Sequence, residues 1–257
     1  ATYDFNSKWS IYGDLQYRRV NYKANGVQAN LIDDTFNFFN PKAGVNFNMD
    51  AKNSFYFSYA RANREPNRTD YEGGTVRPEK LNDFELGWRY ESSKVQWNAN
   101  VYYMLYKDQL ILTGALDDVG NPIRSNSEKS YRLGIEVDAT VALSSKWYWK
   151  PNVTVSTNKN VDLTNNGVAK GNTAIAYSPN LIAGNLIVFQ PLKAVTLTWL
   201  TKFVGEQYLN NLETPEARLP DYVVNDFNVS VTWTPKKVFQ SITVNGLVNN
   251  VLNKQYI

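Results

Sequence analysis

The stretch Lys80–Leu112, KLNDFELGWRYESSKVQWNANVYYMLYKDQLIL, reads as two long strands joined by a short turn at Ser92–Lys94. Apolar and polar side chains alternate through both halves. The apolar set is Phe84, Leu86, Trp88 and Tyr90, then Val95, Trp97, Ala99, Val101, Tyr103 and Leu105. Successive side chains of a strand point to opposite faces, so one face of this hairpin is apolar and the other is polar. The second half is longer than an ordinary strand of about five or six residues. It reaches the roughly 9–11 residues that a tilted strand needs to cross a bilayer.

Composition restricts the classes of protein. The chain has 257 residues, with no Cys, no His and a net charge of +3. Disulfides, thiolate chemistry and a Ser-His active site are therefore excluded. We predict that the chain is not an enzyme, that it holds no cofactor or metal, and that it does not bind nucleic acid. Its mean hydropathy of −0.45 and the lack of any run of about 20 apolar residues argue against a spanning helix. A membrane β-barrel has such a composition, because only alternate residues meet lipid. No signal peptide is recognised, so we expect a mature fragment.

The same alternation recurs along the whole chain and predicts about a dozen strands. Short turns alternate with long loops. The loops are expected at Ala24–Asp34, Arg61–Glu79, Thr113–Glu128, Asn158–Ser178 and Asn210–Pro220. Several tryptophans lie within a few residues of a short turn, where a membrane interface would hold them: Trp9, Trp88, Trp97, Trp147, Trp149 and Trp233. We therefore predict an all-β fold in one domain, residues 1–257. This fold is an antiparallel up-and-down transmembrane β-barrel with short periplasmic turns and long extracellular loops. The alternative is a soluble sandwich with the tryptophans in its core.

Four stretches resemble the barrel of TonB-dependent outer-membrane receptors. They are Phe57–Asn67, Arg77–Trp88, Tyr131–Glu136 and Val248–Tyr256, the last similar to the V-x-N-L-[FL]-[ND]-x-x-Y segment near the end of that barrel. In addition, Val204–Leu209 is similar to Bacteroidetes-type members. The resemblance covers the whole chain in order. It implies a partial barrel, the C-terminal portion of the family's barrel, whose plug domain, TonB-binding segment and final strand are expected to lie outside this sequence.

The resemblance also implies a function and a location. The parent protein is expected in the outer membrane of a Gram-negative bacterium, in contact with its lipid. It is expected to import a scarce nutrient such as a ferric siderophore, energised by the TonB complex and acting with its own plug domain. A TonB-dependent oligosaccharide or cobalamin importer and a passive porin are alternatives. A soluble β-structural or adhesion module is a further one.

Two groups of residues are candidate sites. In the expected loop Arg61–Glu79, cations and an aromatic ring suit an anionic, oxygen-rich chelate. These ligand-binding candidates are Arg61, Arg64, Arg68, Tyr71 and Arg77. They could instead pair with the neighbouring acids Glu65, Asp70 and Glu72, contact lipopolysaccharide phosphates, or be solvated. On the polar face of the strands, the candidates for lining the lumen are Asp83, Glu85, Arg89, Glu91, Glu136 and Asp138. They could instead form cross-strand ion pairs or contact a plug.

Overall fold

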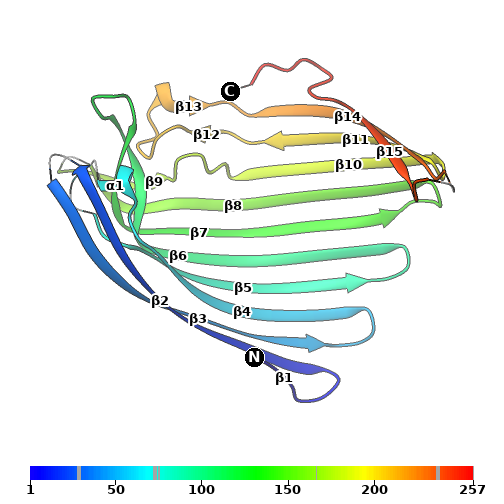
Figure 1. Ribbon diagram of the computed structural model, residues 1–257, viewed down its shortest axis with the longest axis horizontal. Coiled ribbons are helices and arrows are strands. Elements are labelled where there is room, and N and C mark those ends of the chain that lie inside the picture. Colours follow the sequence, from blue (N-terminus) through cyan, green and yellow to red (C-terminus); the bar gives the residue numbers. More distant parts are fainter. Residues whose placement is uncertain (28–29, 72–73, 75, 166, 236–237, 257) are drawn as a thin grey trace.

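The fold is one long curved antiparallel sheet (Figure 1), seen in a computed structural model that describes residues 1–27, 30–71, 74, 76–165, 167–235 and 238–256. Its 13 strands follow the order β1-β2-β3-β4-β5-β6-β7-β8-β10-β11-β14-β15, and β9 pairs with β8. The strands are β1 (Thr2–Asp4), β2 (Trp9–Val27), β3 (Asn30–Asn48), β4 (Asn53–Arg64), β5 (Glu79–Glu91), β6 (Val95–Leu116), β7 (Pro122–Ala142), β8 (Trp147–Asn165), β9 (Val168–Ala174), β10 (Leu181–Leu192), β11 (Val195–Val204), β14 (Tyr222–Trp233) and β15 (Ile242–Val248).

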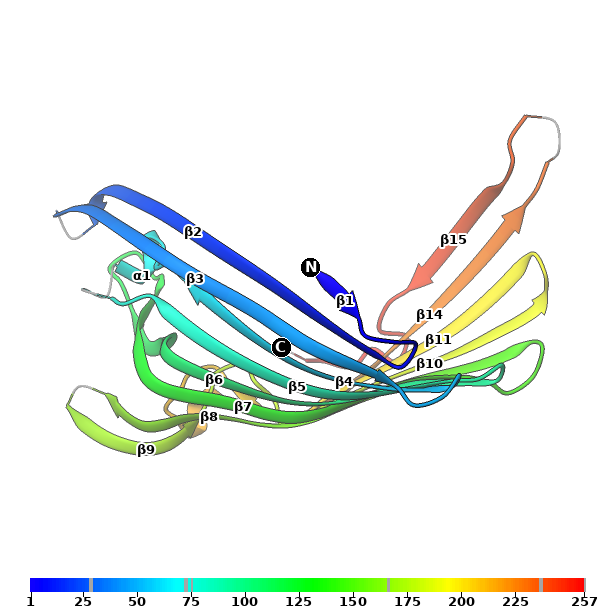
Figure 2. The same ribbon diagram turned by 90° about the horizontal axis from the view of Figure 1, so that it is seen from below.

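Each inner strand of the main path pairs with the strands before and after it in that order, and β1 and β15 pair on one side, as the up-and-down prediction requires. A second sheet holds only β12 (Gln207–Tyr208) and β13 (Arg218–Leu219), and two short helices complete the fold, α1 (Arg68–Tyr71) and η1 (Pro215–Ala217). None of the helices in the described ranges is long and apolar enough to cross a membrane. Figure 2 shows the main sheet as a trough, with β2 and β3 on one flank and β14 and β15 on the other. This is the shape of a barrel wall, and the described strands leave it open between β1 and β15.

The apolar face of the sheet is uncovered. Leu86, Ile135 and Val155 lie mid-strand and are 56%, 51% and 55% exposed. A soluble sandwich would bury such side chains against a second layer, but the described residues outside the main sheet include only β12–β13 and two short helices. The arrangement confirms the transmembrane prediction, in which the exposed apolar side chains meet hydrocarbon.

Tight turns connect the strands at one rim, and polar side chains fix them. The Asn6 Oδ1 atom accepts hydrogen bonds from the backbone N–H groups of Lys8 and Trp9, and Asp50 Oδ1 accepts from those of Lys52 and Asn53. Short polar side chains that bond the backbone two or three residues on are the expected turn formers. Hydrogen bonds from the N–H groups of Lys52 and Asn53 and from the Asn53 amide also hold the pKa of Asp50 below its ordinary value.

Aromatic rings gather just inside this rim. Trp88 meets Trp97 edge to face at 4.8 Å between ring centroids, and Trp147 stacks on Phe189 at 4.2 Å. The position agrees with the predicted interfacial girdle, because indole rings favour the boundary between hydrocarbon and water.

At the other rim the strands run beyond the boundaries expected from sequence. The loops predicted at Ala24–Asp34, Thr113–Glu128 and Asn158–Ser178 are wrong in large part. Strands β2 and β3 extend to Val27 and from Asn30, β6 and β7 occupy most of the second loop, and β8 and β9 form a hairpin in the third. Residues 28–29 and 166 lie outside the described residues. Backbone pairing continues at this rim. The apolar–polar alternation that predicts a strand from sequence ends where the strand leaves the lipid.

The loop predicted at Arg61–Glu79 is shorter than expected, because β4 continues to Arg64 and α1 forms within the remaining segment. The loop predicted at Asn210–Pro220 is confirmed as a connection, and it contains η1. Pro151 lies inside β8, opposite Asn185 of β10. The recorded pairing of β7 with β8 breaks between Asp138↔Asn152 and Val141↔Trp149, where Pro151 supplies no N–H.

Tyrosine–glycine pairs join successive strands on the polar face. Tyr12 lies opposite Gly44, Tyr56 opposite Gly87, and Tyr102 opposite Gly134. Each ring covers its glycine so closely that no Cβ fits: a Cβ built on Gly87 would lie 2.0 Å from Tyr56 Cε1. The glycine therefore supplies the space that seats the ring.

We expect Gly87→Ala to destabilise the folded barrel by about 1–3 kcal/mol, because the new methyl group overpacks against Tyr56. The measurement is the temperature at which the folded band disappears in semi-native electrophoresis. Gly13→Ala is the matched control, since its Cβ would meet only the Lys42 carbonyl oxygen at 4.0 Å. Adding Tyr56→Ala should restore part of the loss; equal behaviour of both glycine variants would contradict the pairing.

A second test compares the two faces at adjacent positions of β8. Val153→Arg should destabilise the barrel in lipid by about 2–4 kcal/mol, because an Arg on the lipid face leaves its charge near mid-membrane. Thr154→Arg should be close to neutral, because Thr154 points to the polar face opposite Glu136. Unfolding in urea from lipid vesicles measures both, and a reversed order would show that the faces are wrongly assigned.

Candidate functional site

The segment between β4 and β5 is held by a small core at the rim of extended strands. Tyr71, Val76 and Leu110 are buried together, and Tyr22, Ala24 and Ile32 pack against them. The Tyr71 ring stacks on Tyr22 at 5.8 Å between centroids, and its hydroxyl donates to Asp34 Oδ2 at 2.6 Å. Burial, with the Asp34 carboxylate beside it, raises the pKa of Tyr71 far above the ordinary value. The phenol is thus a neutral structural group.

A buried carboxylate fastens the same segment to the sheet. Asp70 is fully buried, and its Oδ2 atom accepts a hydrogen bond from the Asn67 N–H at 2.9 Å. Arg64 of β4 lies 3.5 Å from Oδ2, and Arg124 of β7 lies 3.4 Å from Oδ1. A buried charge needs such partners to offset the loss of hydration. Asp70 therefore joins α1 to two strands that are far apart in the sheet.

Further ion pairs surround the cluster of Asp70, Arg64 and Arg124, which we call the Asp70 clip. Arg64 also reaches Glu79 Oε2 at 3.3 Å, and Arg77 bonds Asp108 Oδ1 through Nε at 2.8 Å. Arg18 of β2 pairs with Glu65, donating from Nη1 at 3.0 Å. Burial acts to raise the pKa of Glu65, but a backbone hydrogen bond and Arg18 outweigh it, so this pKa lies below its ordinary value.

The five ligand-binding candidates therefore have different surroundings. Arg64, Tyr71 and Arg77 are engaged with acids, and Arg68 donates to the Asn25 carbonyl oxygen at 3.2 Å. Of the alternatives considered from sequence, pairing with a neighbouring acid holds for Arg64 with Asp70; Glu72 lies outside the described residues. Arg61 differs, because its Nε is buried and has no hydrogen-bond partner among the described residues.

Arg61 and the exposed Lys42 both line a cavity of about 470 Å³ between β2, β3 and β4. Lys42 lies opposite Ala60 on the polar face, whereas Arg61 lies opposite Asn82 and alternates with the polar-face positions, beside the point where the β3–β4 pairing ends. Neither Arg61 nor Lys42 forms an ion pair with a described residue, whereas the other two cations of this cavity, Arg18 and Arg64, are paired. Lys42, which has Asp14 opposite it but forms no ion pair, and Arg61, whose Nε–H has no partner among the described residues, could donate charge-assisted hydrogen bonds to an anionic group. Lys42 was not among the candidates, although its place in the polar alternation of its strand is visible in the sequence.

The lumen candidates share the polar face. Asp83, Glu85, Arg89, Glu136 and Asp138 come from β5 and β7 and alternate with exposed apolar neighbours. No ion pair involving these five is found within the described ranges, so the expected cross-strand pairs are not what holds them. Glu91, which belongs to the same set, accepts a hydrogen bond from the Gln96 amide at 3.3 Å.

Two of these residues have a defined contact, whereas the buried Oδ1 atom of Asp83 has no hydrogen-bond partner among the described residues. Arg89 lies 4.4 Å from the centroid of the Tyr56 ring, and Asn98 donates to Asp138 at 3.3 Å. A second cavity, of about 320 Å³, is lined by Glu85, Glu136 and Arg132. Arg132 donates to Ser178 Oγ at 2.8 Å, and sequence reasoning did not single it out.

Metal binding has little support in the described residues, where no cluster of three or more acidic side chains is placed to hold an ion. The segment Asp117–Asn121 contains acidic and amide side chains that weakly resemble a calcium-binding loop. Asp117 Oδ1 instead accepts from the N–H groups of Val119 and Asn121, which closes a turn.

These features define a class of protein. A single sheet with an uncovered apolar face, a polar face, tight turns at one rim and long strands with a basic cavity at the other is the wall of an outer-membrane β-barrel.

Comparison with known proteins gives the family. Residues 1–251 match the family described as TonB dependent receptor-like, beta-barrel. The chain belongs to this family, whose proteins lie in the outer membrane of Gram-negative bacteria. It is 25% identical over 181 residues to the pesticin receptor of Yersinia enterocolitica, covering 69% of this chain and 25% of that receptor. It is also 28% identical over 111 residues to the ferric-pyoverdine 358 receptor of Pseudomonas putida, covering 42% of this chain and 14% of that receptor.

Solved structures share the fold. The copper transporter OprC superposes with a TM-score of 0.76 at 17% identity, covering 99% of this chain and 41% of the transporter. The ferric citrate transporter FecA in unliganded form superposes with a TM-score of 0.75 at 15% identity, covering 97% of this chain and 39% of the transporter. The chain thus spans about two-fifths of the length of these structures and about a quarter of the pesticin receptor.

We expect Asp70→Asn to loosen the segment between β4 and β5, because Arg64 and Arg124 lose the charge that holds them. Limited proteolysis of the detergent-solubilised protein should cut between residues 65 and 78 at least several-fold faster, with little change in global unfolding. Asp221→Asn is the control, because Asp221 is an exposed loop carboxylate that forms no ion pair with a described residue. Unchanged cleavage would show that the Asp70 clip does not order the segment.

Proposed function

We propose that the protein containing this chain is an outer-membrane active-transport receptor for a ferric siderophore or similar metal chelate, energised through TonB. The family match supports receptor function, and the related receptor for ferric pyoverdine supports a ferric chelate as the substrate class. In this proposal residues 1–257 are one domain, the C-terminal portion of the barrel. The partners are the surrounding outer-membrane lipid, the TonB complex, and a plug domain of the same parent protein. Its activity is transport rather than catalysis.

The observation that carries the substrate class is the basic cavity beneath the rim. Ferric siderophores present oxygen-rich, commonly anionic surfaces. Arg61 and Lys42 form no ion pair within the described residues; Glu65 of the same lining is paired with Arg18, and Asp14 lies opposite Lys42 on β2. Arg64, Tyr71 and Arg77 are assigned a structural role, since their polar groups are engaged with Glu79, Asp34 and Asp108; of the three, Arg64 lines this cavity. Arg68 keeps its place as a candidate contact at the rim.

The polar face below this cavity would line the transport path. Asp83, Glu85, Glu136 and Asp138 make it acidic, with Arg89 held over Tyr56. An acidic wall repels an anionic chelate that has passed the basic rim, so these residues are better suited to contact a plug domain than to retain substrate.

The test uses binding and uptake of three iron-loaded probes, ferric citrate, a ferric catecholate and ferric pyoverdine. For the probe that binds, Lys42→Gln with Arg61→Gln should raise Kd by at least about tenfold for each residue, because charged hydrogen bonds contribute roughly 1.5–3 kcal/mol. Lys52→Gln with Lys94→Gln, in the turns of the opposite rim, removes the same charge and should leave Kd unchanged.

Dependence on TonB separates transport from passage. Deleting TonB should abolish uptake of the bound probe and leave its surface binding intact. Uptake that continues without TonB would identify a passive channel, whereas equal Kd values for both double variants would reject the basic cavity as the binding site.

A further inference from the structure

Three lysines form a row across neighbouring strands at the rim of extended strands. Lys80 of β5 lies directly opposite Lys107 of β6, and Lys107 directly opposite Lys129 of β7. Lys107 and Lys129 are exposed and Lys80 is half-buried. Like charges directly opposite on adjacent strands destabilise a sheet. Among the residues that the structure describes, no acid forms an ion pair with any of the three.

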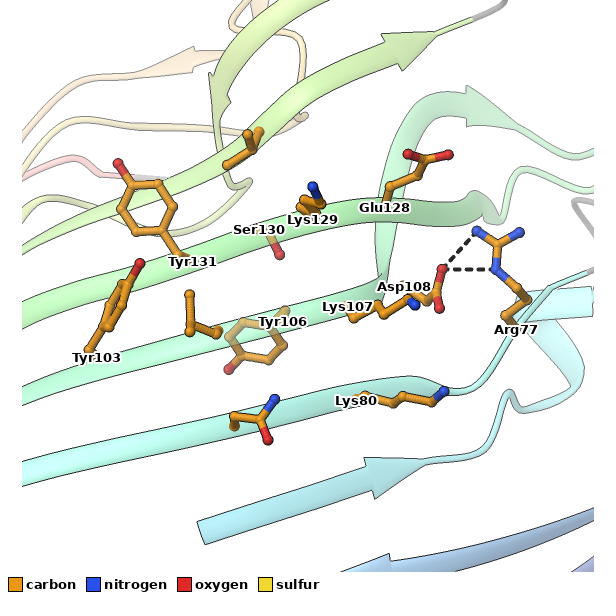
Figure 3. Close-up of a pocket in the computed structure, with 13 residues that line it drawn as sticks. Arg77, Lys80, Tyr103, Tyr106, Lys107, Asp108, Glu128, Lys129, Ser130 and Tyr131 are labelled. Atoms are coloured by element: carbon orange, nitrogen blue, oxygen red, sulfur yellow. Dashed lines mark hydrogen bonds and ion pairs between the residues drawn. The ribbon is translucent and has the colours of Figure 1, made fainter. Parts of the chain in front are cut away.

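The row lines a cavity of about 880 Å³ (Figure 3). Figure 3 shows Lys80, Lys107 and Lys129 in line across three strands, with Tyr103 and Tyr131 further along the same strands. At the other edge, Arg77 already neutralises Asp108, with Nη2 2.7 Å from Oδ1. Glu128 is then the one remaining acid of this lining, so three cations face one carboxylate. The cavity keeps an excess of positive charge.

Alternation places the row on the lipid-facing side. Lys107 follows Val101, Tyr103 and Leu105 at intervals of two residues along β6, and Val101 and Tyr103 are exposed apolar-face side chains. The Tyr103 and Tyr131 rings meet edge to face at 6.2 Å between centroids, just inside the row. Aromatic rings followed by lysines mark the outer boundary of the apolar band.

The depth agrees with this boundary. Lys107 is ten residues beyond Trp97, which belongs to the aromatic group near the tight turns. Ten residues span roughly 33 Å of strand, and a tilt of about 40° reduces this to about 25 Å across the membrane, the height of the apolar band in such barrels. The lysines therefore stand at the level of the outer-leaflet headgroups.

We propose that Lys80, Lys107 and Lys129 form a binding site for the phosphate of an outer-leaflet glycolipid headgroup, whose acyl chains lie along Tyr103, Tyr131 and the apolar face below. Opposed side chains have Cβ atoms about 5 Å apart, so the flexible ammonium groups of all three can converge on one phosphate. A lipid fits better than a soluble anion, because the cavity continues into the face that hydrocarbon already covers. This site is independent of the proposed transport function.

The experiment compares two charge-matched triple variants of the intact receptor in neutral detergent. One is Lys80→Gln, Lys107→Gln and Lys129→Gln; the control is Lys52→Gln, Lys94→Gln and Lys146→Gln, all exposed in tight turns of the opposite rim. Native mass spectrometry measures retention of added bisphosphorylated lipid A. We expect affinity to fall about fivefold for each lysine of the row, which is the usual contribution of one basic residue near an anionic lipid surface, and to be unchanged in the control.

Thermal unfolding gives a second readout, in which the triple substitution should raise the unfolding temperature without lipid and reduce the stabilisation that lipid provides. Without lipid the row variant should unfold at a higher temperature than the natural sequence, because the repulsion between neighbouring lysines is gone. With lipid A the natural sequence should gain more than the row variant does. Equal lipid retention by the two triple variants would overturn the proposal. So would equal protection by dephosphorylated lipid A, or equal protection by inorganic phosphate alone, which would indicate a soluble anion site.

Discussion

Hydrocarbon offers no hydrogen-bond partner to the backbone, so a chain that crosses it as strands must satisfy every peptide group from its neighbours. The inner strands of the main sheet meet this constraint by pairing on both sides along their membrane-crossing lengths. Because the backbone is satisfied within the sheet, the side chains are free to differ between the two faces. Leu86 and Val155 are exposed on the apolar face, while Glu85 and Asn158 lie on the polar face.

Where this constraint acts, the sequence was sufficient to predict the fold. Period two in the membrane segments, and turn formers such as Asn6 and Asp50, are local signals. The strand extensions were missed because β6 and β7 continue past the lipid, where consecutive residues such as Leu110 and Ile111 are buried against neighbouring segments and the period is lost. The candidate site was predictable only in residue type. Tyr71 and Arg77 are engaged by Asp34 and Asp108, acids contributed by other strands, and no local pattern indicates such partners.

Position in the wall decides what a basic residue does. Arg64 is held by two carboxylates and secures α1, Arg61 and Lys42 line a cavity at the rim without forming ion pairs to described residues, and Lys107 projects from the lipid-facing side. The chain as a whole carries a net charge of only +3, so these differences come from placement rather than from composition. A barrel can thus have separate electrostatic surfaces for its substrate and for the membrane around it.

The tyrosine–glycine contacts occur once in each of three successive, non-overlapping strand pairs, β2–β3, β4–β5 and β6–β7. Shifting one strand by a single residue would turn the ring to the opposite face, so each pair encodes its own alignment. A sheet made of such self-aligning pairs can grow by whole hairpins, with every addition correctly seated before the next arrives. The same property lets a lineage lengthen or shorten its barrel two strands at a time without disturbing those already in place.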